Sequence, residues 1–269
     1  MSGIVVTGAA GRMGHCLIAA AQRDPEIRLI GALEKSGNPA MGRDAGEVAG
    51  VGAMDVVITA TLDEIADDWE VLIDFTFPGV TLNLLPLVSA AGRSMIIGST
   101  GFKPEEMEFI RAFAAQQPHV LAPNMSLGVN LLFSLAADVA KRLGDGFDVE
   151  VLETHHRAKQ DAPSGTALRL GEVLASTLGR DLGDVGRYER HGMIGPRPER
   201  EIGFATLRGG DVVGEHTVFF YGHGERLELT HRATSRDTFA TGAMVAAKWV
   251  RRQSPGLYDM QDVLGLREG

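Results

Sequence analysis

The chain has little of several features that mark common protein classes. Its 269 residues contain a single cysteine, Cys16, so an internal disulfide is impossible and a metal site built from several cysteines is not expected. No apolar run reaches the ~18 residues that a membrane-spanning helix needs. The first residues also lack the basic segment and cleavage site of a signal peptide. We therefore expect a cytoplasmic protein with no membrane partner.

Positive charge is also scarce, since 26 Lys and Arg residues stand against 35 Asp and Glu residues, for a formal net charge of −9. Nucleic-acid phosphates favour a basic surface, so we expect no nucleic-acid partner. Residues 155–166 are a local exception, because His155, His156, Arg157 and Lys159 are followed by a Pro-Ser-Gly-Thr turn. The segment is either a solvated basic loop or a site for proton chemistry on a small anion held at a helix start.

The first half of the chain alternates between strand-like and helix-like patterns. Strands are predicted at residues 4–6, 28–33, 56–59, 71–75, 94–97 and 119–122, and helices at 13–23, 80–91 and 103–117. This alternation predicts an α/β domain with a Rossmann-like doubly wound parallel sheet.

The pattern changes after about residue 130. Helices are predicted at residues 131–143 and 167–178, and strands at 147–154, 202–207, 214–221 and 226–231. The Gly-rich turns between the last strands favour a second α+β domain with an open mixed sheet. Residues 179–198 are predicted to form a long surface loop, and a last helix at 238–250 is expected to pack on the first domain.

A glycine-rich turn follows the first predicted strand. Gly8, Gly11 and Gly14 form a G-x-x-G-x-x-G pattern before a helix, and Glu34 ends the next strand. Glycine lets backbone N–H groups approach a pyrophosphate, and the acid suits the ribose hydroxyls, so the pattern predicts dinucleotide binding. Glu34 favours NADH, whereas Lys35 and Arg12 attract the extra phosphate of NADPH, so both cofactors remain candidates.

Three further segments follow predicted strands, at residues 74–76, 98–101 and 122–125. In open α/β sheets, ligands bind beyond the carboxyl ends of the strands. Each segment is therefore either part of the cofactor site or an ordinary turn between a strand and a helix.

Taken together, these motifs resemble the 4-hydroxy-tetrahydrodipicolinate reductase family, also called dihydrodipicolinate reductase. The matching segments occur in the family's order along nearly the whole chain: residues 8–14, 74–76, 98–101, 122–130, 155–166, 203–206, 214–217 and the stretch near Phe239. The run His-His-Arg-x-Lys-x-Asp-x-Pro-Ser-Gly-Thr is far more discriminating than the glycine loop.

The resemblance implies NAD(P)H-dependent reduction of 4-hydroxy-tetrahydrodipicolinate, a small cyclic dicarboxylate, to tetrahydrodipicolinate in bacterial diaminopimelate and lysine biosynthesis. It also implies a cofactor domain formed by residues 1–126 plus 237–269. Residues 127–236 would form the domain that binds substrate and builds a homotetramer through its sheet.

The resemblance also assigns roles to single residues. His155 and Lys159 correspond to the catalytic proton-transfer groups, and His156, Gly165 and Thr166 to substrate ligands. The cofactor contacts would be Gly8, Ala9, Ala10, Gly11, Arg12, Met13, Glu34, Lys35, Gly98, Ser99, Thr100, Ala122, Pro123, Asn124 and Met125. Many relatives have arginine where Lys35 stands, and lysine lacks arginine's bidentate fork for a phosphate. Ser99 stands where threonine is common, a change expected to be mild.

The sequence leaves open whether His155 or Lys159 gives the proton. Four other histidines lack metal-ligand spacing and are expected to be structural or on the surface: His191, His216, His223 and His231.

Rival functions are a different NAD(P)-dependent dehydrogenase or a nucleotide sensor. A semialdehyde-type enzyme needs a catalytic cysteine, but Cys16 lies in the predicted cofactor helix. No Tyr-x-x-x-Lys pair and no Gly-Lys-Ser/Thr of a kinase-type P-loop occurs. A sensor would bind NAD(P) without needing the basic cluster.

Overall fold

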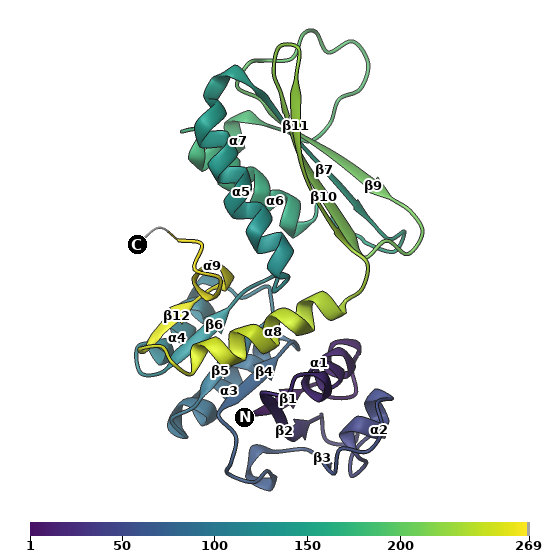
Figure 1. Ribbon diagram of the computed structural model, residues 1–269, viewed down its shortest axis with the longest axis vertical. Coiled ribbons are helices and arrows are strands. Elements are labelled where there is room, and N and C mark those ends of the chain that lie inside the picture. The colour runs from purple at the N-terminus through teal and green to yellow at the C-terminus, as the bar shows by residue number, and fades with distance from the viewer. Residues whose placement is uncertain (268–269) are drawn as a thin grey trace. The chain divides into compact units, whose positions relative to one another are not determined.

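Each of two units of the chain is built around its own sheet in the computed structural model, which describes residues 1–267 (Figure 1). The first unit comprises Met1–Leu127 together with the chain from Arg236 onward, and the second comprises Gly128–Ser235. Across residues 1–267, no helix has the length and apolar character needed to cross a bilayer.

The sheet of the first unit has seven parallel strands in the order β12-β6-β5-β4-β1-β2-β3. The strands are β1 (Ser2–Thr7), β2 (Ile27–Leu33), β3 (Ile58–Thr59), β4 (Val71–Asp74), β5 (Ser94–Ile97), β6 (Pro118–Leu121) and β12 (Gly256–Tyr258). The order reverses between β4 and β2 on either side of β1, which is the switch point of a Rossmann sheet. The predicted fold class is confirmed, whereas the three-residue strand β12 was not predicted.

Helices cover both faces of this sheet, because the buried strand residues alternate between two apolar clusters. Ile4 and Val6 pack with α1 (Arg12–Arg23) and α8 (Asp237–Val250), while Val5 packs with α3 (Pro78–Ala90) and α4 (Pro104–Ala114). Shorter elements complete the unit: α2 (Ala45–Ala49), the 3₁₀ turn η1 (Leu62–Glu64) and α9 (Met260–Val263).

Helix α8 returns from the far end of the chain to the core of the first unit, as predicted. Ala240, Ala243 and Ala247 are fully buried in the cluster that also holds Ile4 and Val6. Gly242 lies so close to the main chain that a methyl group added there would stand 1.8 Å from the carbonyl oxygen of Met125. Small residues therefore let this helix approach the segment that follows β6.

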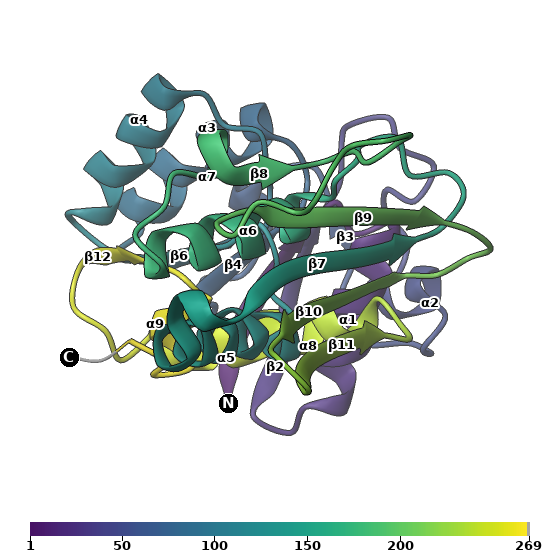
Figure 2. The same cartoon turned by 90° about the horizontal axis from the view of Figure 1, so that it is seen from above.

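The second unit contains a mixed sheet with the order β11-β10-β7-β9-β8 (Figure 2). Its strands are β7 (Asp148–His155), β8 (Gly186–Arg187), β9 (Ile202–Arg208), β10 (Gly214–Tyr221) and β11 (Arg226–Ala233). The pairs β7–β9 and β8–β9 are parallel, and β10 is antiparallel to both β7 and β11. This is the open mixed sheet that the sequence predicted.

Two long helices cover one face of the mixed sheet (Figure 1). Helices α5 (Leu127–Leu143) and α6 (Gly165–Thr177) pack on Val149, Val151 and the alternate residues of the neighbouring strands. A 3₁₀ turn, η2 (Gly144–Gly146), joins α5 to β7. Because side chains alternate along a strand, Leu152 and Phe219 point away from these helices.

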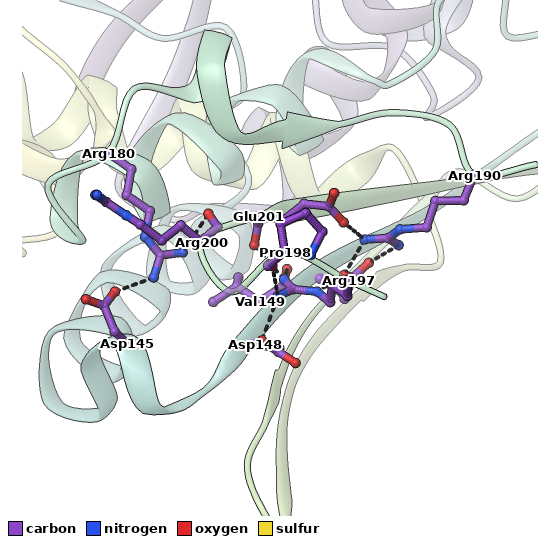
Figure 3. A network of polar contacts seen from close by, with 10 residues as sticks. Asp145, Asp148, Val149, Arg180, Arg190, Arg197, Pro198, Arg200 and Glu201 are labelled. Atoms are coloured by element: carbon purple, nitrogen blue, oxygen red, sulfur yellow. Dashed lines mark hydrogen bonds and ion pairs between the residues drawn. The ribbon is translucent and has the colours of Figure 1, made fainter. Parts of the chain in front are cut away.

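The segment predicted as a long loop at residues 179–198 is more ordered than expected, because it contains α7 (Leu182–Val185) and β8. Its remainder is tied to the sheet by two arginines (Figure 3). Arg190 donates two hydrogen bonds of 2.7 Å to Glu150, and Arg197 donates one of 3.0 Å to Glu150 and one of 2.6 Å to Asp148. Acidic residues of β7 thus hold this segment against the sheet through ion pairs.

Candidate active site

The glycine turn after β1 has the close backbone packing expected of a phosphate-binding loop. Gly8 has a φ of +62°, a conformation that favours glycine. A side chain at Gly14 would stand 2.2 Å from the carbonyl oxygen of Gly8. Gly11 lies at the N-cap of α1, whose first turn carries N–H groups without intrahelical acceptors. The loop therefore fits the pyrophosphate of a dinucleotide.

Glu34 lies beside this loop. It directly follows β2, and its carboxylate accepts a hydrogen bond of 3.3 Å from the N–H of Ala10. Lys35, the next residue, is exposed. The acid and the glycine turn thus meet at the carboxyl edge of the sheet, as a ribose-binding acid requires.

A buried carboxylate joins several turns at the same edge. Asp74, at the end of β4, is fully buried and accepts hydrogen bonds from Thr7 Oγ1 at 2.7 Å, Thr76 Oγ1 at 2.5 Å and Ser99 Oγ at 3.2 Å. The hydroxyl of Thr81, in α3, also donates to it. The side chain of Ser99 is therefore directed inward, and any contact it makes with a cofactor must come from its backbone.

All fifteen residues predicted to contact the cofactor lie in the loops and helix start at the carboxyl ends of β1, β2, β5 and β6. Ala9, Ala122 and Met125 are buried, so these three offer backbone rather than side-chain contacts. The structure thus brings the predicted set to one edge, and its role in binding NAD(P) remains a prediction.

The second cluster begins at the end of β7. His155 Nδ1 lies 2.5 Å from the carboxylate of Glu153, and both side chains are buried. Burial lowers the pKa of His155 below its ordinary value; the Glu153 carboxylate opposes this shift, and the charges of Lys159 and Arg208 reinforce it. His155 is therefore a neutral imidazole at neutral pH.

Lys159 lies in the turn that follows. Its Nζ is 2.9 Å from a carboxylate oxygen of Asp161, and its backbone N–H donates to the carbonyl of His156 at 3.1 Å. The side chain is mostly covered, whereas Asp161 is exposed. The turn therefore holds a charged ammonium group near the neutral ring of His155, close enough to depress its pKa.

The predicted anion-binding residues open helix α6. Ser164 is its N-cap, and its hydroxyl accepts a hydrogen bond of 3.2 Å from the N–H of Ala167. Gly165 is exposed, and a methyl group added there would meet nothing within 4 Å. Packing alone does not demand glycine at this position, and its small size leaves the helix start open to a ligand.

His216, expected to be structural or on the surface, lies in this cluster. Its Nε2 is 3.1 Å from the hydroxyl of Ser164, and its ring meets the ring of His155 edge-on with centroids 5.2 Å apart. Burial is the largest cause that lowers the pKa of His216 to about 3. His216 therefore supports the site as a neutral ring.

Two charged members of the cluster were missed in the sequence, Glu153 and Arg208. Both guanidinium NH groups of Arg208, at the end of β9, donate to Glu153 at 2.8 Å. The signal for Glu153 was present, because it alternates with Val149, Val151 and His155 on the buried face of β7. Arg208 gave no such signal, since its pairing with β7 is a tertiary contact.

Profiles of known protein families match both units. The profile described as the N-terminus of dihydrodipicolinate reductase matches residues 2–125, and the one for its C-terminus matches residues 128–264. The 4-hydroxy-tetrahydrodipicolinate reductase of Citrifermentans bemidjiense is 54% identical over 264 residues, covering 98% of this chain and 99% of that protein. The enzyme of the same name from Geobacter sulfurreducens is 54% identical over 267 residues, covering 99% of this chain and 100% of that protein.

Solved structures show the same fold at lower sequence identity. A dipicolinate-bound dihydrodipicolinate reductase from Paenisporosarcina sp. TG-14 has a TM-score of 0.78 and 21% identity, covering 97% of this chain and 98% of that one. An amine dehydrogenase from Mycobacterium smegmatis has a TM-score of 0.60 and 13% identity, covering 100% of this chain and 97% of that one. The family profiles and the full-length relatives carry the assignment: the chain belongs to the dihydrodipicolinate reductase family, as an oxidoreductase whose N-terminal unit is the NAD(P)-binding domain.

Proposed function

We propose that this chain reduces 4-hydroxy-tetrahydrodipicolinate to tetrahydrodipicolinate with NADH or NADPH, in diaminopimelate and lysine biosynthesis, and that His155 and Lys159 handle the proton. The hydroxyl group of the substrate leaves as water in the overall reaction. The observation that carries the proposal is the full-length match to reductases of that name together with the cluster at the start of α6. We assign the cofactor to residues 1–126 plus 237–269 and the substrate to residues 127–236.

The bound nicotinamide cofactor supplies the hydride. The protein's task is then to hold a dianionic substrate and to deliver a proton where negative charge develops. The start of α6, with Gly165 and Thr166, is suited to one carboxylate because helix N-termini attract anions. His156, half-buried just before the turn, is the third proposed substrate ligand.

Lys159 is the proposed proton donor. Burial keeps His155 neutral at neutral pH, so Lys159 is the member of the pair that carries a proton to give. Its ammonium charge also stabilises the negative charge that follows hydride addition. His155 then serves as a proton acceptor or relay beside it.

Following NADH absorbance with the hydroxylated dicarboxylate present tests this function. We expect consumption of NADH in proportion to the substrate supplied. A protein that binds NADH and leaves it unconsumed would be a sensor rather than a reductase.

Lys159→Ala tests the assignment of Lys159 as the proton donor. Loss of one charge-stabilising donor typically costs about 10²- to 10³-fold in kcat, and we expect a loss of that size with unchanged NADH affinity. Lys141→Ala, which removes an exposed lysine from α5, is the matched control. Near-normal turnover of Lys159→Ala would refute the assignment.

The second unit is also the proposed tetramer-forming part. The sheet face opposite α5 and α6 carries apolar side chains, among them Leu152, Ala205 and Phe219, together with Leu207 and Tyr221, which are 52% and 38% exposed. The rings of Phe219 and Tyr221 stack with centroids 5.6 Å apart. A sheet face of this composition supports self-association, because burying it removes apolar surface from water.

A further inference from the structure

The carboxylate of Glu153 is the most heavily engaged charged group in the second unit's candidate site. Its side chain is 1% exposed. One oxygen accepts from His155 Nδ1 at 2.5 Å and from Arg208 at 2.8 Å, and the other accepts from Arg208 at 2.8 Å and from the N–H of Ser164 at 2.9 Å. Thr206 Oγ1 lies 3.4 Å from the second oxygen. A buried charge with this many partners is fully compensated.

Glu153 is ionised in this setting. Burial raises the pKa of its carboxyl group, but the hydrogen bonds from Arg208, His155 and Ser164 outweigh burial and hold the pKa below the ordinary value. An ionised carboxylate only accepts hydrogen bonds. The Nδ1 atom of His155 must therefore carry a proton, which it donates to Glu153.

This contact leaves Nε2 as the reactive nitrogen of His155. In a neutral imidazole only one nitrogen is protonated, so Nε2 has a free lone pair. Nε2 faces Gly214 of β10, where an added methyl group would stand 2.9 Å from it. A side chain at Gly214 would therefore collide with that nitrogen.

The same carboxylate also fixes the start of α6. Ser164 donates its backbone N–H to Glu153, while its hydroxyl caps the helix and contacts His216. The Ser164 hydroxyl thus lies between the Ala167 N–H, from which it accepts at 3.2 Å, and His216 Nε2 at 3.1 Å. One carboxylate thus sets both the orientation of the His155 ring and the position of the helix terminus.

We propose that Glu153 is the positioning residue of this site, clamped by Arg208, and that it aligns the proton-transferring nitrogen of His155 with the anion-binding start of α6. This inference rests on the roles proposed above for His155 and α6. It adds a residue that touches neither substrate nor cofactor and acts through two groups that do.

Glu153→Gln tests the proposal, because it preserves shape and removes the charge. We expect kcat to fall by about 10- to 100-fold with little change in NADH affinity. Nitrogen-15 NMR of the unliganded protein should show a lower pKa for His155, since the negative charge that raises it is gone. The same spectra should show that the Nδ1-protonated tautomer is no longer the only one populated.

Glu150→Gln is the matched control. Glu150 lies on the same strand and also pairs with two arginines, Arg190 and Arg197, but it contacts neither His155 nor Ser164. If buried ion pairs had only a structural role, both variants would lose similar amounts of kcat. If Glu153 is the positioning residue, Glu150→Gln keeps normal turnover and a normal His155 titration.

Arg208→Gln covers the case in which Glu153→Gln does not fold. It releases the clamp while leaving the carboxylate in place, and we expect a smaller loss of kcat and a shift of the His155 titration. Wild-type kcat and an unchanged His155 tautomer in either folded variant overturn the inference. Because the NMR arm needs no turnover, an inactive wild-type protein would refute the proposed function without deciding the role of Glu153.

Discussion

At the scale of single residues, cofactor choice depends on two adjacent side chains of opposite charge. The carboxylate of Glu34 accepts a hydrogen bond from the N–H of Ala10 in the glycine loop, and the neighbouring Lys35 is exposed. The carboxylate suits ribose hydroxyls, whereas the ammonium group attracts a 2′-phosphate without the bidentate grip of arginine. A protein with this pair is expected to use both cofactors.

Lys35→Ala should therefore weaken NADPH more than NADH. We expect the Kd for NADPH to rise about tenfold, equivalent to ~1.4 kcal/mol, and the Kd for NADH to change less than about twofold. Fluorescence titration measures both constants. Arg111→Ala, an exposed change in α4, controls for net charge, and equal losses for the two cofactors would contradict the prediction.

The residues near His155 show what a sequence conveys about a site. His155, Lys159 and Gly165 were found because they are close in sequence and match a family motif. Arg208 and His216 reach the same cluster from other strands through the sheet register, which the sequence does not encode locally. Glu153 is an intermediate case. An acidic residue that alternates with valines can be recognised from the residue pattern, whereas its hydrogen-bond partners cannot.

At the scale of elements, the longer and more apolar helices and strands were predicted more accurately than the short ones. The expected strand at 94–97 agrees with β5, and the one at 214–221 with β10, because each is a strand-like run bounded by turns. The short elements α7, β8 and β12 were missed, since two to four residues carry no periodic pattern. Strand β8 forms by pairing with β9, and β12 forms by pairing with β6, so both depend on tertiary contacts.

Gly242 in α8 gives a prediction about how elements fit together. Alanine normally stabilises a helix by up to ~1 kcal/mol relative to glycine, but here its methyl group would stand 1.8 Å from the carbonyl of Met125. We expect Gly242→Ala to lower the free energy of unfolding by about 1–3 kcal/mol, the usual cost of overpacking. Urea unfolding measures this.

Thr241→Ala is the control for this change, because Thr241 is the exposed neighbour in the same helix. We expect it to be neutral or stabilising. If Gly242→Ala were as stable as Thr241→Ala, α8 would not press against the segment after β6. A weaker affinity for NADH in Gly242→Ala would further support the proposed role of Met125.

At the scale of the whole molecule, the uncovered face of the mixed sheet predicts self-association. Leu207→Glu places a charge on this face, and we expect the proposed tetramer to dissociate into smaller species because a buried unpaired charge is costly. Sedimentation velocity reports the change. Leu87→Glu, on an exposed position of α3 that is 56% accessible, should leave the association unchanged. A monomeric wild-type protein would contradict the prediction outright.

The change in the residue pattern near residue 130 predicted a second domain, and the family resemblance implied that the last helix belongs to the first. The first unit is assembled from both ends of the chain, whereas the second, Gly128–Ser235, is continuous. During synthesis the middle unit is complete on the ribosome while the Rossmann sheet still lacks α8 and β12. The second unit can therefore fold first, and the first unit becomes whole only after α8 and β12 have been synthesised.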